Sequence, residues 1–194
     1  MGQISRGRSL RQIFCAPGRD ETFEDAFGAL TWPDDIEIGS VDFDQEFAQL
    51  RFSDKVDFFR REIEDHYWSK GAMLLGRSFG GWILLNTLVG FDAAYPGTVI
   101  LISSVLGYGS AEGLQFIAPN ADGFWREVER SAGPPSDRML LLHSTDDQQC
   151  SISYAERLAK AWSIELIAFD NGGHDLGKIH HLDEVSRLIH EKWL

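Results

Sequence analysis

The sequence predicts an α/β fold, in which a mainly parallel sheet of about six strands lies between layers of helices. Two observations predict it: short apolar runs alternate with longer segments of helical periodicity, and no internal repeat or low-complexity linker interrupts them. The chain has 194 residues, of which 43% are hydrophobic and 12% aromatic, which is enough for one large core. We therefore expect a single domain that spans residues 1–194.

Six runs have the length and the apolar content of buried strands. Turn-forming residues such as Gly, Pro, Asp and Ser flank them, as they usually flank strands. The expected strands cover residues 11–16, part of 35–43, 71–76, 98–104, 138–144 and 164–169. A helical segment follows each run, so most neighbouring strands are expected to be parallel.

The helical segments carry their apolar residues on one face. Thr22 and Ser53 precede two of these segments and have side chains suited to cap a helix. Residues 79–89 are apolar nearly all round, which is typical of a central helix buried against a sheet. Ser153 is expected to begin a further helix through a capping box, and residues 182–193 to form the closing helix.

The longest interruption of this alternation covers residues 107–137. Its Gly and Pro residues predict a small cap-like insertion with one or two short helices, too small for a second domain. Its aromatic side chains have two open interpretations: they line an acyl pocket, or they fasten the cap to the core. These residues are Tyr108, Phe116, Phe124 and Trp125.

Composition excludes several classes of partner. The formal net charge of −12 argues against a nucleic acid or an anionic membrane surface, because both attract clustered Lys and Arg. No long apolar run and no apolar leader segment occur, so we expect a cytoplasmic protein. Cys15 and Cys150 are too few for a disulfide framework or a complete zinc site, and are expected to be small buried residues. No metal is expected.

Chemically useful residues follow four of the expected strands. In a doubly wound sheet, residues at the carboxyl ends of the strands converge on one crevice. Residues 17–19 follow the first strand, Ser78 the third, Asp146 and Asp147 the fifth, and His174 the sixth. A serine needs an imidazole to take its proton and a carboxylate to orient that imidazole, and this edge supplies all three groups.

The motifs that carry these residues are "GRSFGG", "LLLHSTDDQQC" and "NGGHDL". In this order they resemble the α/β-hydrolase family, over nearly the whole chain. The resemblance implies a compact, three-layer α/β-hydrolase fold, with Ser78 as the nucleophile and His174 as the base. It favours Asp147 over Asp146 as the acid, because Asp147 takes the place of the family's Asp in the Gly-x-x-Asp-x-x-Val-Pro pattern.

The resemblance also implies an oxyanion hole. Gly76 and Gly80 allow the strand to turn abruptly into a helix, and the N–H of Phe79 directly after the nucleophile would be one donor. The second donor would lie in the loop after the first strand. Since Pro17 has no N–H, that donor is expected to be the N–H of Arg19.

These residues imply a serine hydrolase that cleaves a small ester or thioester through an acyl-enzyme intermediate, without a cofactor. The short cap favours a small-molecule acyl substrate. Three alternatives stay open: an amidase or peptidase, a carbon–carbon hydrolase, and a non-catalytic binding module built on the same scaffold. Arg77 and His143 are expected to have structural roles, Arg77 in a salt bridge with a carboxylate and His143 in a hydrogen bond.

Overall fold

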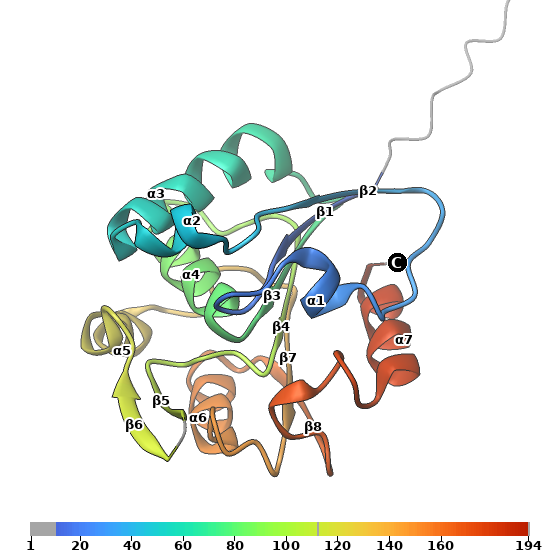
Figure 1. The fold of residues 1–194 in the computed structure, drawn as a ribbon. Coiled ribbons are helices and arrows are strands. Elements are labelled where there is room, and N and C mark those ends of the chain that lie inside the picture. The colour runs from blue at the N-terminus through green and yellow to red at the C-terminus, as the bar shows by residue number, and fades with distance from the viewer. Residues whose placement is uncertain (1–10, 112, 194) are drawn as a thin grey trace, which may run out of the picture.

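The structure is a computed structural model that describes residues 11–111 and 113–193 (Figure 1). Its main sheet has six strands in the order β2-β1-β3-β4-β7-β8, and every neighbouring pair is parallel. The strands are β1 (Arg11–Ala16), β2 (Ile36–Ser40), β3 (Ala72–Arg77), β4 (Thr98–Ile102), β7 (Met139–Ser144) and β8 (Glu165–Phe169). All six predicted strands are confirmed, within a three-layer α/β architecture.

Helices cover both faces of this sheet (Figure 1). They are α1 (Phe23–Phe27), α2 (Gln45–Gln49), α3 (Phe52–Glu62), α4 (Ser78–Leu88), α5 (Ala121–Arg130), α6 (Ile152–Trp162) and α7 (Leu182–Trp193). One core lies between the sheet and α3 to α6, and a smaller one lies between the sheet and α1 with α7. Successive residues of β3 enter the two cores alternately, because neighbouring side chains of a strand point to opposite faces.

The observed helix starts agree only in part with the starts predicted from the sequence. Thr22 caps α1 as predicted, and α4 is buried nearly all round. The two predictions for Ser53 and Ser153 are wrong by two residues. Helix α3 begins after Arg51, whose side chain pairs with an acidic residue of the first turn, and Ser151 caps α6 by accepting a hydrogen bond from the Ser153 N–H. In both cases the chain becomes helical before the residue that sequence rules favour.

The insertion at residues 107–137 contains the helix α5, as predicted. It also contains a two-stranded antiparallel sheet, β5 (Tyr108–Ala111) with β6 (Leu114–Ile117), which the sequence analysis missed because these short strands lack an apolar alternation. Phe124 and Trp125 are buried in the large core, where Phe124 packs edge-on against Trp82. These two aromatics therefore fasten the insertion to the core. No helix within the described ranges is long and apolar enough to cross a membrane.

Candidate active site

Ser78 lies at a sharp turn between β3 and α4. Its φ of +49° is in the left-handed region, which is uncommon for a residue with a side chain and is found at strained functional turns. The backbone packs closely around it: a Cβ on Gly76 would lie 2.6 Å from the Cα of Gly81, and one on Gly80 would lie 2.2 Å from the carbonyl oxygen of Pro17. Gly76 and Gly80 thus give the turn the space it requires.

The structure brings Ser78, His174 and Asp147 into one chain of contacts. Nε2 of His174 lies 2.9 Å from Oγ of Ser78, and Nδ1 lies 3.0 Å from Oδ2 of Asp147. His174 sits on a single 3₁₀ turn (Gly173–Asp175) after β8, and Asp147 follows β7. The serine, the imidazole and the carboxylate therefore come from the carboxyl ends of three different strands.

Asp147 is held in place by its own loop. Its Oδ1 accepts hydrogen bonds of 2.9 Å from the N–H groups of Gln149 and Cys150. Burial acts to raise the pKa of Asp147, but the contact with His174 and the N–H of Cys150 outweigh it and hold that pKa below its usual value. The side chain is fully buried and favours the ionised form, as an orienting carboxylate requires.

His143 also contacts this loop. Its Nε2 is 2.5 Å from the carbonyl oxygen of Cys150, to which it donates, and 3.5 Å from Oδ2 of Asp147. Burial lowers the pKa of His143, which favours the neutral form. His143 therefore braces the loop and leaves the charge of Asp147 in place, in keeping with the structural role expected of it.

Asp146 faces a different group. Its Oδ1 accepts hydrogen bonds from Gly173 at 2.8 Å and Gly172 at 3.1 Å, and from the hydroxyl of Ser144 at 2.7 Å. The N–H of Gly173, followed by the Ser144 hydroxyl, lowers the pKa of Asp146. Asp147, and not Asp146, contacts the imidazole of His174. Asp146 instead holds Gly172 and Gly173, the two residues before His174, through their N–H groups.

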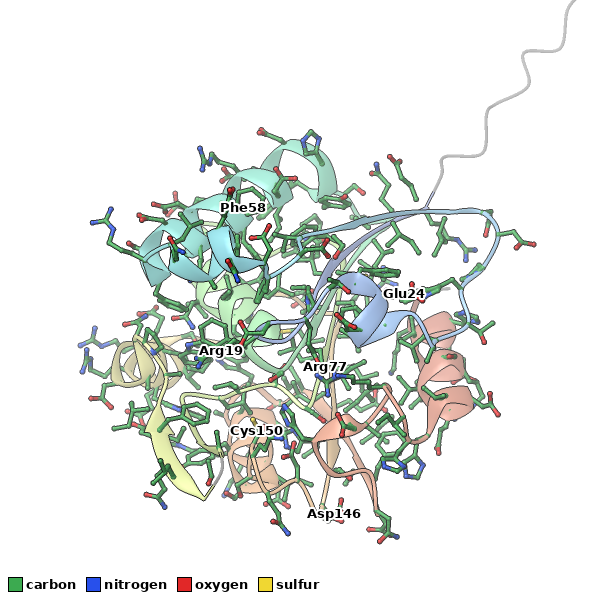
Figure 2. The ribbon with its side chains drawn as sticks, viewed as in Figure 1. Arg19, Glu24, Phe58, Arg77, Asp146 and Cys150 are labelled. Atoms are coloured by element: carbon green, nitrogen blue, oxygen red, sulfur yellow. The ribbon has the colours of Figure 1, made fainter. Side chains whose placement is uncertain are left out.

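Arg77 joins three loops at the centre of the molecule (Figure 2). Its side chain is 2% exposed, and its Nη1 lies 2.8 and 2.9 Å from the two carboxylate oxygens of Glu21, on the loop after β1. Its Nη2 donates to the backbone oxygen of His174 at 2.7 Å. Lys178 also pairs with Glu21, at 2.6 Å. Burial acts to raise the pKa of Glu21, but these two cations outweigh it and lower that pKa.

The loop after β1 lies directly against Ser78. A Cβ on Gly18 would stand 3.3 Å from the Cβ of Ser78. The N–H of Gly18 donates to Glu21 at 2.9 Å, whereas within the described residues the N–H of Arg19 has no acceptor. The N–H of Phe79 is in the first turn of α4, where amides have no partner within the helix. In the part of the chain that the structure describes, neither expected oxyanion donor is thus already engaged in a backbone hydrogen bond that would prevent it from binding a substrate oxygen.

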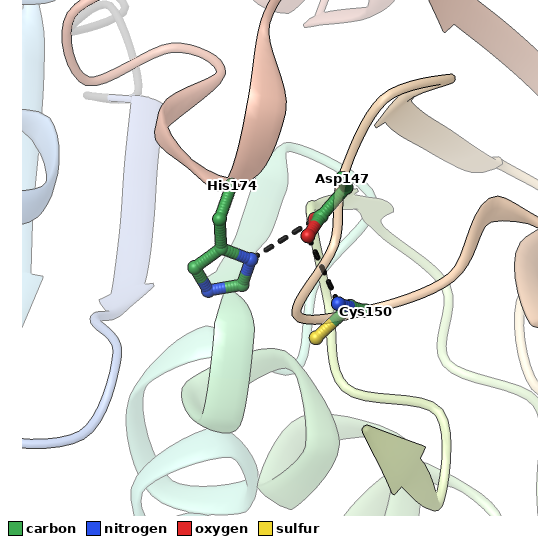
Figure 3. A group of neighbouring side chains, drawn as sticks. All are labelled: Asp147, Cys150 and His174. Carbon is green, nitrogen blue, oxygen red and sulfur yellow. Dashed lines mark hydrogen bonds and ion pairs between the residues drawn. The ribbon is translucent and has the colours of Figure 1, made fainter. Parts of the chain in front are cut away.

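Cys150 completes a compact group with Asp147 and His174 (Figure 3). One ligand-type atom from each residue lies within 4.8 Å of the others. A metal ion there would have to replace the hydrogen bond between Asp147 and His174. It would also need the thiolate of Cys150, whereas burial raises the pKa of that thiol. The donor set therefore fits an orienting hydrogen bond better than a metal site.

A cavity of about 330 Å³ lies beside Phe79 and Arg19. Sequence analysis missed most of its wall, because α2 was not predicted. The available signal was the spacing of phenylalanines on either side of Asp44, which caps α2. The side chains that line the cavity include Phe43, Phe47, Phe52, Phe79, Arg19 and Lys55.

A larger hollow of about 520 Å³ lies between β5, β6 and the start of α6. It is lined by Tyr108 and Phe116 of the insertion, and Tyr108 stacks on Tyr154 with their ring centres 5.3 Å apart. None of the five predicted site residues borders this hollow. The smaller cavity is therefore the better candidate for a substrate pocket. None of the insertion's four aromatics lines it, so of the two open interpretations the fastening role is the one that Phe124 and Trp125 fit.

Comparison with known proteins identifies the fold. No family model matches the sequence, and none of the curated proteins matches it either. Solved structures do match. The chain is similar to the ydeN gene product of B. subtilis (TM-score 0.68, 17% identity, covering 94% of this chain and 98% of the other). It is also similar to MGS-MChE2, an α/β hydrolase enzyme from the metagenome of lagoon sediments at Mar Chica, Morocco (TM-score 0.67, 13%, 93% and 89%). A third is the esterase domain of a Rhodothermus marinus protein (TM-score 0.62, 16%, 95% and 85%).

These structural likenesses extend over almost the entire chain. At such low identities they establish the architecture and leave the chemistry to the residues of the site. The protein has the α/β-hydrolase fold, as the three sequence motifs indicated.

Proposed function

We propose that this protein is a serine hydrolase that cleaves a small ester or thioester through an acyl-enzyme intermediate. The observation that carries the proposal is the unbroken chain of contacts from Ser78 through His174 to Asp147, with distances of 2.9 and 3.0 Å. The two structural neighbours described as an α/β hydrolase enzyme and an esterase domain are in accord with it.

In the proposed reaction, Oγ of Ser78 attacks the carbonyl carbon while Nε2 of His174 takes the serine proton. Asp147 accepts a hydrogen bond from Nδ1, which keeps the imidazole in the tautomer that can accept a proton at Nε2. His174 then protonates the leaving alcohol or thiol, and the acyl group stays on Ser78. A water molecule repeats the sequence, giving up its proton to His174, and the carboxylic acid leaves.

Negative charge develops on the substrate oxygen in both steps. The N–H groups of Phe79 and Arg19 are proposed to stabilise it, because backbone donors fixed in advance do not need to reorganise as the charge forms. The start of α4 adds the positive end of the helix dipole at the same point. These contributions require no cofactor.

A fluorophosphonate probe tests the proposal, because it reacts with an activated serine and not with an ordinary one. We expect the wild-type protein to be labelled at neutral pH, and Ser78→Ala to be unlabelled. Ser104→Ala is the matched control: this serine is also buried beside the turn, but no base contacts its hydroxyl within the described part of the chain. A wild-type protein that stays unlabelled, when a known serine esterase reacts in the same assay, would contradict the proposal.

A further inference from the structure

The cavity beside Phe79 contains a buried lysine. Lys55 is 7% exposed, and its ammonium donates to the backbone oxygens of Ala48 at 2.9 Å and Leu50 at 2.6 Å. An ammonium has three protons to donate, so these bonds leave one. Across residues 11–111 and 113–193, no carboxylate lies within 4.0 Å of this group. Lys55 is thus a buried cation without a counter-ion, lining a cavity.

A buried charge without a counter-ion lowers the free energy of unfolding. Burying a charge disfavours the charged form unless an opposite charge or enough hydrogen bonds compensate it. Burial, and after it the charge of Arg19, lower the pKa of Lys55, and Asp54 opposes them only in part. A bound anion would offset both effects.

Arg19 supplies a second cation to the same cavity. Its guanidinium lies over the ring of Phe79, 4.9 Å from the ring centre, and Figure 2 places it beside the first turn of α4. It forms no ion pair within 4.0 Å with any described carboxylate. Asp20 is the acidic residue on the cavity wall, so the lining carries two cations and one anion. The cavity lining is therefore locally positive, although the whole chain has a net charge of −12.

The remaining wall is apolar. Phe43 and Phe47 stack with their ring centres 4.7 Å apart, and Phe52 packs against Phe79 at 6.2 Å. Rings of this kind accommodate methylene groups, whereas the free proton of Lys55 and the guanidinium of Arg19 suit an anionic end group. The cavity therefore has an apolar part and a positively charged part next to the residues proposed to bind the reacting carbonyl.

We infer that this cavity binds an acyl chain that ends in a carboxylate, so that the substrate is a monoester or monothioester of a dicarboxylic acid. The inference rests on the proposed function for the reaction itself. The phenylalanines would contact the methylenes of the chain, and Lys55 with Arg19 would bind the distant carboxylate. The chemistry at Ser78 is unchanged: water adds, and the alcohol or thiol leaves with the proton from His174.

Two esters that differ only in the end group test the inference. These are the mono-p-nitrophenyl ester of adipic acid and p-nitrophenyl hexanoate, whose chains have equal length but end in a carboxylate and a methyl group. We expect the wild type to have the higher kcat/KM for the adipate ester. We expect Lys55→Gln to lower the adipate-to-hexanoate ratio of kcat/KM by about tenfold, the size of one hydrogen bond to a charged group. Lys55→Arg should retain the preference, because it retains the charge.

Lys160→Gln is the matched control, since Lys160 is an exposed lysine of α6 that does not line the cavity. It should leave the ratio of the two kcat/KM values unchanged. Thermal unfolding followed by circular dichroism identifies any variant that fails to fold. If Lys55→Gln lowers kcat/KM equally for both esters, or if the wild type hydrolyses both without preference, the inference is overturned.

Binding separates this inference from the proposed function. Calorimetric titration of Ser78→Ala with the adipate ester measures affinity without turnover, and the same titration of the Ser78→Ala, Lys55→Gln double variant should show about tenfold weaker binding. If the protein hydrolyses p-nitrophenyl hexanoate but binds the adipate ester no better than p-nitrophenyl hexanoate, only the carboxylate site is contradicted. A protein that binds the adipate ester through Lys55 but resists fluorophosphonate would contradict the hydrolase alone.

Discussion

Arg77 donates a hydrogen bond of 2.7 Å to the backbone oxygen of His174, the residue whose side chain contacts Ser78. Arg77 directly precedes Ser78 in the sequence, so one side chain connects the serine turn to the imidazole loop. The same guanidinium pairs with both carboxylate oxygens of Glu21, which in turn accepts the N–H of Gly18. The loop after β1, the serine turn and the loop that carries His174 thus meet at one buried cation.

Replacement of Arg77 should impair turnover more than substrate binding. In Arg77→Met the backbone oxygen of His174 loses its donor, so the imidazole is held less firmly against Ser78. We expect kcat to fall by about tenfold to a hundredfold with little change in KM, because small misplacements of reacting groups have effects of this size. Arg77→Lys should recover part of the loss. The measurement is steady-state kinetics with p-nitrophenyl esters.

Arg60→Met is a matched control for this prediction. Arg60 also donates to a backbone oxygen, that of Gly90 at 2.9 Å, but it lies on α3 away from Ser78. It should leave kcat nearly unchanged. If Arg77→Met raised KM and left kcat intact, Arg77 would act on binding and not on the position of His174.

Glu21 should contribute to stability in a pH-dependent way. Its pKa is depressed in the folded protein, so its contribution is fully present above its unfolded pKa of about 4.3 and is lost as the pH falls through the lower, folded pKa. At neutral pH, Glu21→Gln leaves the buried Arg77 without its main partner, which costs about 3 kcal/mol. The difference in melting temperature between wild type and Glu21→Gln should stay constant from pH 7 to about 5 and shrink in more acidic buffer.

Glu129→Gln is the control for that experiment. Glu129 pairs with Arg157 at the surface, where both side chains are about half exposed or more, and such pairs add little to stability. It should have little effect on the melting temperature at any of these pH values. A difference for Glu21→Gln that grows toward low pH would contradict the ion-pair assignment.

The two neighbouring aspartates should respond differently to the same substitution. Asp147→Asn removes the charge that orients His174 and favours the wrong tautomer, so kcat should fall by about 10³- to 10⁴-fold. Asp146→Asn keeps a carbonyl oxygen that can still accept from Gly172 and Gly173, so we expect a loss of less than about tenfold. Kinetics of the two variants side by side provide the test. A larger loss for Asp146→Asn would exchange the proposed roles.

Gly80 should tolerate no side chain. In Gly80→Ala the new methyl group would lie 2.2 Å from the oxygen of Pro17 and 2.3 Å from that of Ala16, both of which belong to the backbone. The loop after β1 must therefore move, which displaces Arg19 from its proposed role. We expect a lower melting temperature and a large loss of kcat. Gly133→Ala is the control, since its methyl group would meet nothing within 4 Å and should leave both quantities unchanged.

The sequence was sufficient to predict the strands of the main sheet and the site residues that follow them. The central strands β3, β4 and β7 consist mostly of continuous apolar runs, and parallel order places Ser78, Asp147 and His174 at one edge. The positions of α2, β5 and β6 could not be predicted, because each of these elements spans only four or five residues and none has a clear apolar periodicity. Lys55 and Glu21 were missed because their roles depend on contacts between distant segments: only the folded chain shows that Lys55 lines a cavity and that Glu21 faces Arg77.

The candidate site can form only after segments far apart in the sequence have come together during folding. Ser78 and His174 are 96 residues apart in the chain, and Lys178 meets Glu21 across 157 residues. Contacts between such remote segments form slowly, because closing long loops costs entropy before the contacts compensate for it. Turnover during refolding should therefore recover after the helices have formed, so an activity assay measures the fraction of molecules whose whole sheet is assembled.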